Sequence, residues 1–374
     1  MRAYSIIYFI SAITVSFVGA YSNLIYNLAV DMAEYCRISY CIKGFGNYDF
    51  LIDAPSLQTG DISLACPTLT FCQDNKDIEI VQILNPNISK AEISGSGYVA
   101  INHAKRHIIV VSRGSYTIQD WVSDFEFALV PYKRCSFCTV HKGVYMATEV
   151  IKKQAWDTIK NLLNKYPDYE LIATGHSLGG GLTALVGLEM QLDFKKRVTV
   201  VSLAGLKIGN NHLAEFIDET FNSSKYLESV NDNDANGTQF GGFLRVVHEA
   251  DIVPLIPPTP LYSHGGIELY INKVRLPHPQ ESTEIKGMYK YEPLSSQLFN
   301  ILSQKSLQET LTIYEHNNYF MYIYGCNSTS VADFIPGPNP PTDGNITAAA
   351  LRATMINHPT SYSRSTLVAS VTTY

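Results

Sequence analysis

Along this chain, segments with the hydrophobic pattern of β-strands alternate with segments that have the hydrophobic spacing of α-helices. Four short apolar runs are typical of buried strands, at residues 97–101, 107–112, 171–174 and 198–203. Residues 148–166 place apolar side chains on one face of a helix that ends at Pro167, and the pattern at 179–190 also predicts a helix. Because strands that alternate with helices form βαβ units, we expect an α/β fold with a mostly parallel central sheet flanked by helices.

The first twenty residues have the pattern of a secretory leader. Arg2 supplies a positive start, residues 6–18 form an apolar run, and small residues follow at 18–20. The apolar run is shorter than the ~20 residues of a membrane-spanning helix. We therefore expect residues 1–20 to be a signal peptide, with a short N-terminal membrane anchor as the alternative.

The rest of the chain divides into one long domain and a tail. We assign residues 21–326 to the domain, because the strand and helix patterns continue to that point without an internal repeat. Residues 327–374 are rich in Ser, Thr and Pro and predict a flexible extension, with a short helix near 348–355.

Composition and charge exclude several classes of protein. Hydrophobic residues make up 46% of the 374 residues and charged residues 17%, so the chain can bury a core and is not disordered as a whole. The net charge is −6 and no basic patch dominates, which argues against a nucleic-acid partner. No zinc-protease, EF-hand or dinucleotide-binding pattern occurs, so we expect neither a metal nor a cofactor. No obligate protein partner is evident.

Cysteines and glycosylation sequons favour export. The close spacing of Cys66 with Cys72 and of Cys135 with Cys138 suits small disulfide loops in an oxidising compartment. The chain has seven cysteines, an odd number, so at least one thiol stays free or pairs with another chain. Five N-x-S/T sequons support the same conclusion, at Asn87, Asn222, Asn236, Asn327 and Asn345. The sequence therefore predicts a secreted protein.

The residues that carry chemistry begin with a G-x-S-x-G motif at 175–179. The motif lies between an expected strand and an expected helix, which is the context that a nucleophile elbow requires. Ser177 would then lie on a sharp turn, and the helix N-terminus would supply N–H groups for an oxyanion. The alternative is an ordinary glycine-rich turn with an N-cap serine.

A serine hydroxyl is a weak nucleophile and needs a base and an orienting acid. In this type of fold the acid and then the histidine follow the serine along the chain. Asp251 comes just after the strand-like residues 244–248 and is the favoured acid. Asp218, Asp232 and Asp234 are rivals, and we expect the last two to lie in a solvated loop.

Four histidines follow Asp251. His358 lies in the tail, and His278 lies between two prolines in an expected exposed loop. His264 and His316 remain as candidates for the base, and His316 is favoured because aromatic residues follow it near the end of the domain. Two earlier histidines are expected to have structural or supporting roles, at His176 and His248.

These segments, in this order, resemble the fungal-type class 3 triacylglycerol lipases. The matching segments are residues 111–115, 140–144, 174–180, 245–248 with 251–254, and 316–320, with a weaker match around Tyr40 and Cys41. The resemblance implies an α/β-hydrolase fold, with Ser177 as nucleophile, Asp251 as orienting acid and His316 as general base. It also implies an oxyanion hole formed by Ser115 and the backbone N–H of Leu178.

The resemblance further implies a pattern of disulfides. The implied pairs are Cys41–Cys326, Cys66–Cys72 and Cys135–Cys138, and Cys36 would remain free. The first pair would tie the start of the domain to its end and anchor the segment that carries His316.

The segment after Ser115 predicts a short amphipathic helix. Its apolar face would carry Ile118, Trp121, Val122 and Phe125. The lid of the resembled family lies at this place, and such a helix can cover the site in water and turn its apolar face to lipid. The alternative is an ordinary packed surface helix.

The sequence as a whole predicts a secreted serine hydrolase of carboxylic esters. The substrate that we expect is an acylglycerol, bound transiently at a lipid–water interface and cleaved through an acyl-enzyme. A feruloyl esterase or a phospholipase A1 on the same fold is an alternative, and so is a non-catalytic secreted lipid-binding protein. One departure from the family pattern is the absence of a proline at 202–210, near the expected active-site edge, which leaves the shape of the acyl pocket open.

Overall fold

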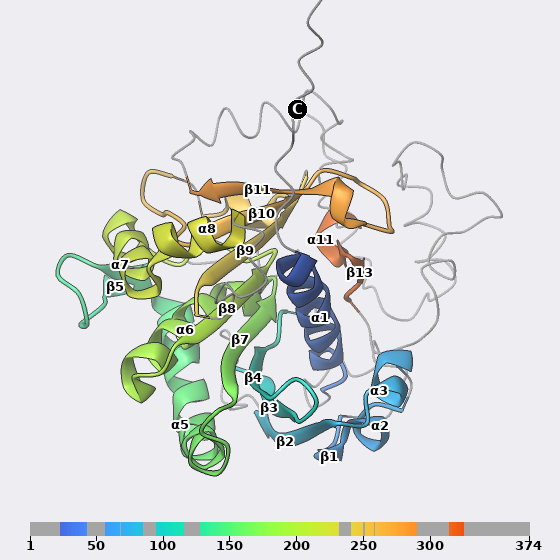
Figure 1. Ribbon diagram of the computed structural model, residues 1–374. Coiled ribbons are helices and arrows are strands. Elements are labelled where there is room, and N and C mark those ends of the chain that lie inside the picture. The colour runs from blue at the N-terminus through green and yellow to red at the C-terminus, as the bar shows by residue number, and fades with distance from the viewer. Residues whose placement is uncertain are drawn as a thin grey trace, which may run out of the picture.

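A central sheet organises the molecule (Figure 1). The structure is a computed structural model that describes residues 23–42, 57–67, 69–84, 95–115, 128–231, 241–249, 251–257, 259–289 and 314–324. Within these ranges nine strands form the sheet, in the spatial order β1 (Gly60–Asp61), β2 (Ile78–Leu84), β3 (Gly97–Asn102), β4 (His107–Ser112), β7 (Glu170–His176), β8 (Val198–Leu203), β9 (Phe243–His248), β10 (Ile267–Ile271) and β11 (Thr283–Met288).

The middle of this sheet is parallel. Strands β4, β7, β8, β9 and β10 are parallel neighbours, whereas β1 to β4 pair antiparallel at one margin and β11 pairs antiparallel at the other. The predicted mostly parallel central sheet is therefore confirmed. Gly175 on β7 pairs with Ser112 and with Ser202, and Leu203 pairs with Val246, so the carboxyl ends of four strands meet at one edge. In open parallel sheets this is the edge where ligands bind.

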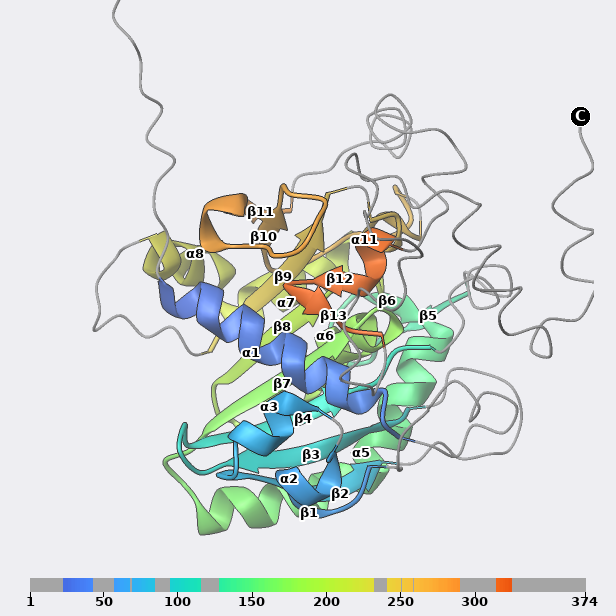
Figure 2. The ribbon, with the colours of Figure 1, turned by 90° about the vertical axis from the view of Figure 1, so that its right-hand side faces the viewer.

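Each face of the sheet carries its own hydrophobic core, because successive side chains of a strand point to opposite sides. On β4, Ile109 and Val111 pack into one core, and Ile108 and Val110 pack into the other. The helices over these cores are α1 (Asn23–Ser39) on the first face, and α5 (Lys142–Lys165) and α6 (Leu178–Phe194) on the second. Figure 2 shows α1 lying across the sheet. Burial on both faces explains why the inner strands are continuous apolar runs.

Helix α5 begins at Lys142, before the start that the hydrophobic pattern predicts at 148. His141 is its N-cap, and the Nδ1 atom of this histidine accepts hydrogen bonds from the N–H groups of Gly143 (3.1 Å) and Val144 (3.3 Å). Histidine is not among the side chains that usually cap helices, so this start could not be predicted from the sequence.

The remaining elements surround the sheet. They are α2 (Ile62–Ala65), α3 (Thr70–Asp74), α7 (Asn211–Phe221), α8 (Ser223–Asn231), the 3₁₀ helices η2 (Val253–Leu255) and η3 (Gln280–Ser282), α11 (Tyr314–Asn317), the hairpin of β5 (Leu129–Pro131) with β6 (Thr139–His141), and the hairpin of β12 (Asn318–Tyr319) with β13 (Met321–Tyr322). The β13 strand contacts α1, so the hairpin after α11 lies beside that helix (Figure 2).

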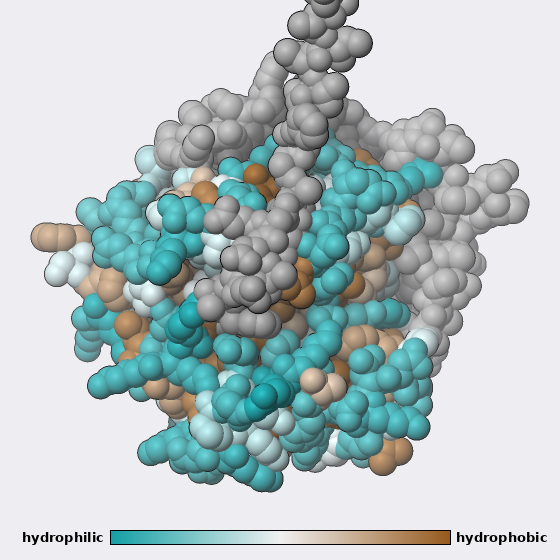
Figure 3. All heavy atoms as spheres, viewed as in Figure 1, coloured by the Kyte–Doolittle hydropathy of each residue, from teal (hydrophilic) through white to brown (hydrophobic). Residues whose placement is uncertain are grey.

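The surface facing the viewer in Figure 3 is mostly hydrophilic, with apolar atoms in small scattered groups. Among the described helices, none combines the length and the apolar composition that crossing a bilayer demands.

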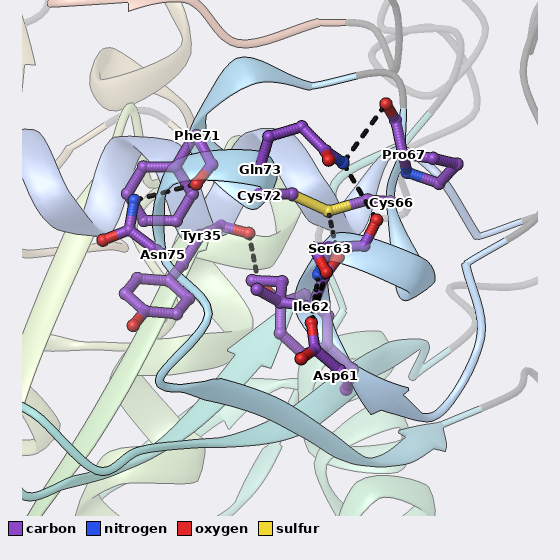
Figure 4. Close-up of a disulfide and its surroundings, with 11 residues drawn as sticks. Tyr35, Asp61, Ile62, Ser63, Cys66, Pro67, Phe71, Cys72, Gln73 and Asn75 are labelled. Carbon is purple, nitrogen blue, oxygen red and sulfur yellow. Dashed lines mark hydrogen bonds between the residues drawn. A yellow bond between two sulfur atoms is a disulfide. The ribbon is translucent and has the colours of Figure 1, made fainter.

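A disulfide between Cys66 and Cys72 joins α2 to α3 (Figure 4). The Cα atoms of the two cysteines are 6.0 Å apart. The Nε2 of Gln73 donates a hydrogen bond to the carbonyl of Ser63 (2.9 Å), so a side chain from α3 also holds α2. The two short helices are thereby fixed against each other beside the edge of the sheet.

The other cysteines differ in their state. Cys135 and Cys138 form a second disulfide, with Cα atoms 5.6 Å apart, in the turn between β5 and β6. Cys41 is also disulfide-bonded, and the thiol of Cys36 is free and buried. Burial raises the pKa of Cys36 to about 12.

Some predicted features lie outside the described residues. They are the leader at 1–20, the lid residues Ile118, Trp121, Val122 and Phe125, the extension at 327–374 with its helix near 348–355, Cys326, Asp232, Asp234 and His358. The expectations for them, including the Cys41–Cys326 pair, remain predictions.

Candidate active site

Ser177 lies on a sharp turn between β7 and α6. Its φ and ψ angles are 61° and −126°, a backbone conformation that non-glycine residues adopt only at an energetic cost. The N–H of Ser177 donates to the carbonyl of Leu203 on β8 (3.0 Å), and its carbonyl accepts from the N–H of Gly181 (3.1 Å). A strained serine between a strand and a helix is the geometry of a nucleophile elbow, here at the carboxyl edge of the sheet.

Close packing around this elbow requires glycine, as Gly179 and Gly114 illustrate. A Cβ atom on Gly179 would lie 2.2 Å from the carbonyl oxygen of Ser112, so α6 can approach β4 only without a side chain there. A Cβ atom on Gly114 would lie 2.4 Å from the hydroxyl of Tyr40 and 3.2 Å from the Cβ of Ser177. The segment after β4 therefore runs directly against the serine.

Asp251 and His316 form a buried pair. The Nδ1 of His316 lies 3.0 Å from Oδ1 and 2.9 Å from Oδ2 of Asp251, and the two side chains are 3% and 0% exposed. Asp251 follows β9, and His316 lies in α11. Because a carboxylate only accepts hydrogen bonds, Nδ1 carries a proton, and in the neutral ring Nε2 has the free lone pair. The structure thus brings together the acid and the base that the sequence favoured.

Further hydrogen bonds hold the carboxylate of Asp251. The hydroxyl of Tyr319 donates to Oδ2 (2.7 Å), and the N–H of Val253 donates to Oδ1 (2.9 Å). The Tyr319 oxygen in turn accepts from the N–H of His248 (3.0 Å). Burial alone would raise the pKa of Asp251, but the charge of His316 and the hydrogen bonds outweigh it, and the pKa lies below its ordinary value. Asp251 is therefore an ionised acceptor.

Two reactive atoms of the site have no hydrogen-bond partner among the described residues, the Oγ of Ser177 and the Nε2 of His316. They are not hydrogen-bonded to each other in this structure, a looseness that is common in catalytic pairs before a substrate binds. These are the two atoms between which a base-activated serine exchanges its proton.

His176, the residue before Ser177, is fully buried. Its Nε2 lies 2.7 Å from the carbonyl oxygen of His316, and its Nδ1 lies 2.8 Å from the hydroxyl of Tyr40. A carbonyl only accepts, so Nε2 carries the proton and Tyr40 donates to Nδ1. Burial and, to a lesser extent, the charge of His316 lower the pKa of His176 to about 3, so this ring is neutral at physiological pH.

The residues of the predicted oxyanion hole border the elbow. Leu178 is the first residue of α6, where backbone N–H groups have no acceptor within the helix. Ser115 is half-buried and follows Gly114, which packs against Ser177. A role for Ser115 and Leu178 in binding an oxyanion remains a prediction.

The described rivals for the acid and the base have structural partners instead. Asp218 accepts a hydrogen bond from the N–H of Gly266 (2.6 Å). His264 donates from Nε2 to the carbonyl of Pro254 (2.7 Å). Both bonds fix loops, so the geometry favours Asp251 and His316.

The expectation that His278 is exposed is wrong, because this residue is only 2% exposed. Its Nδ1 accepts from the N–H of Phe320 (3.1 Å), and its carbonyl accepts from the hydroxyl of Tyr26 (2.8 Å). Tyr26 belongs to α1 and Phe320 follows β12, so segments distant in sequence bury a loop whose prolines suggested exposure.

Sequence reasoning did not predict the roles of Tyr319 and Tyr40. Tyr319 lies 68 residues after Asp251, and Tyr40 lies 136 residues before His176. The only signals were the aromatic run after His316 and a weak family match at residue 40. Neither signal predicts which residues the hydroxyl groups of Tyr319 and Tyr40 contact.

Lys207 holds the loop that follows Asp251. It lies in the stretch 202–210, and it is 1% exposed. Its backbone N–H and Nζ donate to three successive carbonyls, those of Ile256 (2.9 Å), Leu255 and Pro257 (3.4 Å). Burial and then the charge of Arg245 lower the pKa of Lys207 to about 7.

Throughout the described ranges, no group of three or more His, Cys, Asp and Glu side chains is placed to hold a metal ion. The chemistry that the described side chains support is nucleophilic attack by a serine, assisted by a histidine and a carboxylate.

Comparisons with known proteins agree with this geometry. Residues 109–261 match the family model described as "Lipase (class 3)". LIH1 of Saccharomyces cerevisiae is 30% identical over 332 residues, a match that covers 80% of this chain and 97% of LIH1. Secreted mono- and diacylglycerol lipase 2 of Gibberella zeae is 30% identical over 247 residues, covering 56% of this chain and 57% of that protein.

Solved structures show the same fold. Lip2 lipase of Yarrowia lipolytica has a TM-score of 0.63 at 22% identity, covering 83% of this chain and 97% of Lip2. The lipase of Rhizopus microsporus var. chinensis has a TM-score of 0.60 at 21% identity, covering 82% of this chain and 90% of that chain. The expected α/β-hydrolase fold is confirmed. The chain belongs to the class 3 lipase family and is a carboxylic-ester hydrolase.

Proposed function

We propose that this protein is a secreted lipase that hydrolyses acylglycerols at a lipid–water surface through an acyl-enzyme on Ser177. The Asp251–His316 pair carries this proposal, because it leaves the Nε2 of His316 without a partner among the described residues, and the His316 ring packs against His176, the residue before the strained Ser177. The membership of the class 3 lipase family and the acylglycerol lipase of Gibberella zeae support the substrate class.

In the first half of the reaction, the Oγ of Ser177 attacks the ester carbonyl carbon while the Nε2 of His316 takes the serine proton. The resulting imidazolium is stabilised by the ionised Asp251. His316 then gives that proton to the departing glycerol oxygen as the carbonyl–oxygen bond breaks, which leaves the acyl group on Ser177.

In the second half, water attacks the acyl carbon and passes a proton to His316. The fatty acid leaves and the proton returns to the Oγ of Ser177. During each attack the carbonyl oxygen carries negative charge, and Ser115 with the N–H of Leu178 would hold it. Losing one donor of this kind costs about 2.7–4 kcal/mol in a model protease.

The test compares wild type with Ser177→Ala on a panel of triacylglycerols, diacylglycerols, phospholipids and feruloyl esters. We expect wild type to cleave acylglycerols and to be labelled at Ser177 by a fluorophosphonate, and the variant to do neither. Ser229→Ala is a matched control in α8, because its hydroxyl bonds only the Tyr226 carbonyl in the described contacts. Preferential cleavage of phospholipids or feruloyl esters would support the alternative esterases, and lipid binding without labelling would support a non-catalytic protein.

The predicted lid has a separate test. If Ile118, Trp121, Val122 and Phe125 form an apolar face that opens onto lipid, activity should rise sharply when a long-chain ester exceeds its solubility. A smooth hyperbolic response through that concentration would contradict the lid.

Secretion rests on the predicted leader, on the disulfides and on the sequons. Of the sequons, Asn222 is exposed at the end of α7, as a glycosylated asparagine must be. We expect the full chain to appear in the medium with its leader removed and with glycan at Asn222. Retention of the chain in cell membranes would support the N-terminal anchor instead.

A further inference from the structure

We propose that His176 is a positioning residue for the general base: held by Tyr40, it binds the main-chain carbonyl of His316 and so fixes where the His316 imidazole lies. This inference rests on the proposed serine mechanism and assigns a task to a residue that touches neither the substrate nor the transferred proton.

The contacts of His176 join three parts of the chain. Tyr40 comes directly after α1, His176 ends β7 beside the nucleophile, and His316 lies in α11. The His176 and His316 rings also pack against each other, with centroids 4.7 Å apart. His176 therefore contacts both the backbone and the ring of the base.

The hydrogen bond from His176 supplies a donor to a buried backbone carbonyl, that of His316. Helix α11 has only four residues, and the last four carbonyl groups of any helix receive no hydrogen bond from within it. The carbonyl of His316 therefore needs a donor from elsewhere in the chain. The Nε2–H of His176 donates to the His316 carbonyl (2.7 Å), and both residues are buried. Without that donor the backbone of His316 would lose one of the contacts that hold it in place.

Tyr40 supports the tautomer of His176 that the His316 carbonyl requires. Because Nε2 donates to the His316 carbonyl, Nδ1 is free to accept from the Tyr40 hydroxyl (2.8 Å), and this bond stabilises the same tautomer. The low pKa of His176 adds to this, because a neutral ring does not repel the imidazolium that His316 becomes during the reaction. The Tyr40 hydroxyl also packs against Gly114, next to the predicted oxyanion residue Ser115.

Two amide substitutions separate positioning from simple core packing. In His176→Gln the side-chain amide lies near the former Nε2 and can donate to the His316 carbonyl. In His176→Asn the amide lies near the former Nδ1, so it can meet Tyr40 but does not reach His316. We expect kcat to fall about 5- to 100-fold in His176→Asn with little change in KM, and to recover substantially in His176→Gln.

Tyr40→Phe removes only the hydroxyl, and Tyr35→Phe is its matched control. Both tyrosines are buried at the end of α1, and the Tyr35 hydroxyl accepts from Asn102 (3.1 Å), away from the site. We expect Tyr40→Phe to lower kcat about 2- to 10-fold and Tyr35→Phe to leave it unchanged, although both lose one buried hydrogen bond. Thermal unfolding of each variant reports any general loss of stability.

Equal kcat values for His176→Asn and His176→Gln, or for Tyr40→Phe and Tyr35→Phe, would overturn the inference. Failure of the proposed function gives a different result: wild type itself would neither cleave acylglycerols nor react with a fluorophosphonate. If wild type reacts and all four variants match it, only the role of His176 is refuted.

Discussion

Removing the hydroxyl of Tyr319 should slow the reaction without touching the three residues that carry it. The hydroxyl donates to the ionised Oδ2 of Asp251 at 2.7 Å inside a fully buried site. A hydrogen bond to a charged group contributes about 1.5–3 kcal/mol. If all of it is lost in the transition state, Tyr319→Phe lowers kcat by a factor of about 10 to 150.

The substitution should also change the pH dependence. Because the Tyr319 hydrogen bond is one of the interactions that lower the pKa of Asp251, its loss lets Asp251 bind a proton at higher pH. The acid limb of the kcat profile should therefore move to higher pH in Tyr319→Phe. The loss of stability in Tyr319→Phe should be greatest at neutral pH and should shrink as the pH falls through the range in which Asp251 takes up a proton, since a carboxyl with a depressed pKa stabilises the fold only while it is ionised.

The assay is hydrolysis of a soluble short-chain ester across pH, normalised to active sites titrated with a fluorophosphonate. Tyr226→Phe is the matched control, because Tyr226 is 4% exposed and its hydroxyl has no hydrogen-bond partner within the described residues. Unchanged kcat and an unchanged acid limb in Tyr319→Phe, with only a lower melting temperature, would refute the reasoning and leave Tyr319 a purely structural role.

Three further predictions concern the framework of the site. Lys207 has a pKa of about 7 when folded and a higher one when unfolded, so unfolding takes up a proton between about pH 7 and 10 and stability should rise with pH there. Lys207→Met should flatten that rise in urea unfolding curves, and identical pH dependence in the two proteins would contradict it. Gly179→Ala places a Cβ 2.2 Å from a backbone oxygen of β4, so we expect a loss of more than about 2 kcal/mol of unfolding free energy, whereas wild-type stability would show that the elbow can move. Cys36, buried with a pKa raised to about 12, should react with a thiol reagent only after unfolding, and rapid labelling of the native protein would show that α1 opens.

The sequence allowed much of the framework to be predicted, because strands and helices leave local periodic patterns. The elbow at Ser177 was also predictable, since its motif and its strand–helix context are adjacent in the chain. The start of α5 was not, because His141 caps the helix in place of a more usual residue. The burial of His278 and the contacts of Tyr40 and Tyr319 depend on residues far away in sequence, which no local pattern encodes.

The placement of α1 has a consequence for how the enzyme becomes active during synthesis. This helix ends at Ser39, whereas the strand β7 that it covers begins at Glu170, so the ribosome completes the helix long before its docking surface exists. Until then, Ile25, Leu28 and Met32 have no sheet to cover them, and the phenol of Tyr40 has no imidazole to meet. Newly made chains therefore stay dormant until the first helix packs on its face of the sheet and brings Tyr40 to His176.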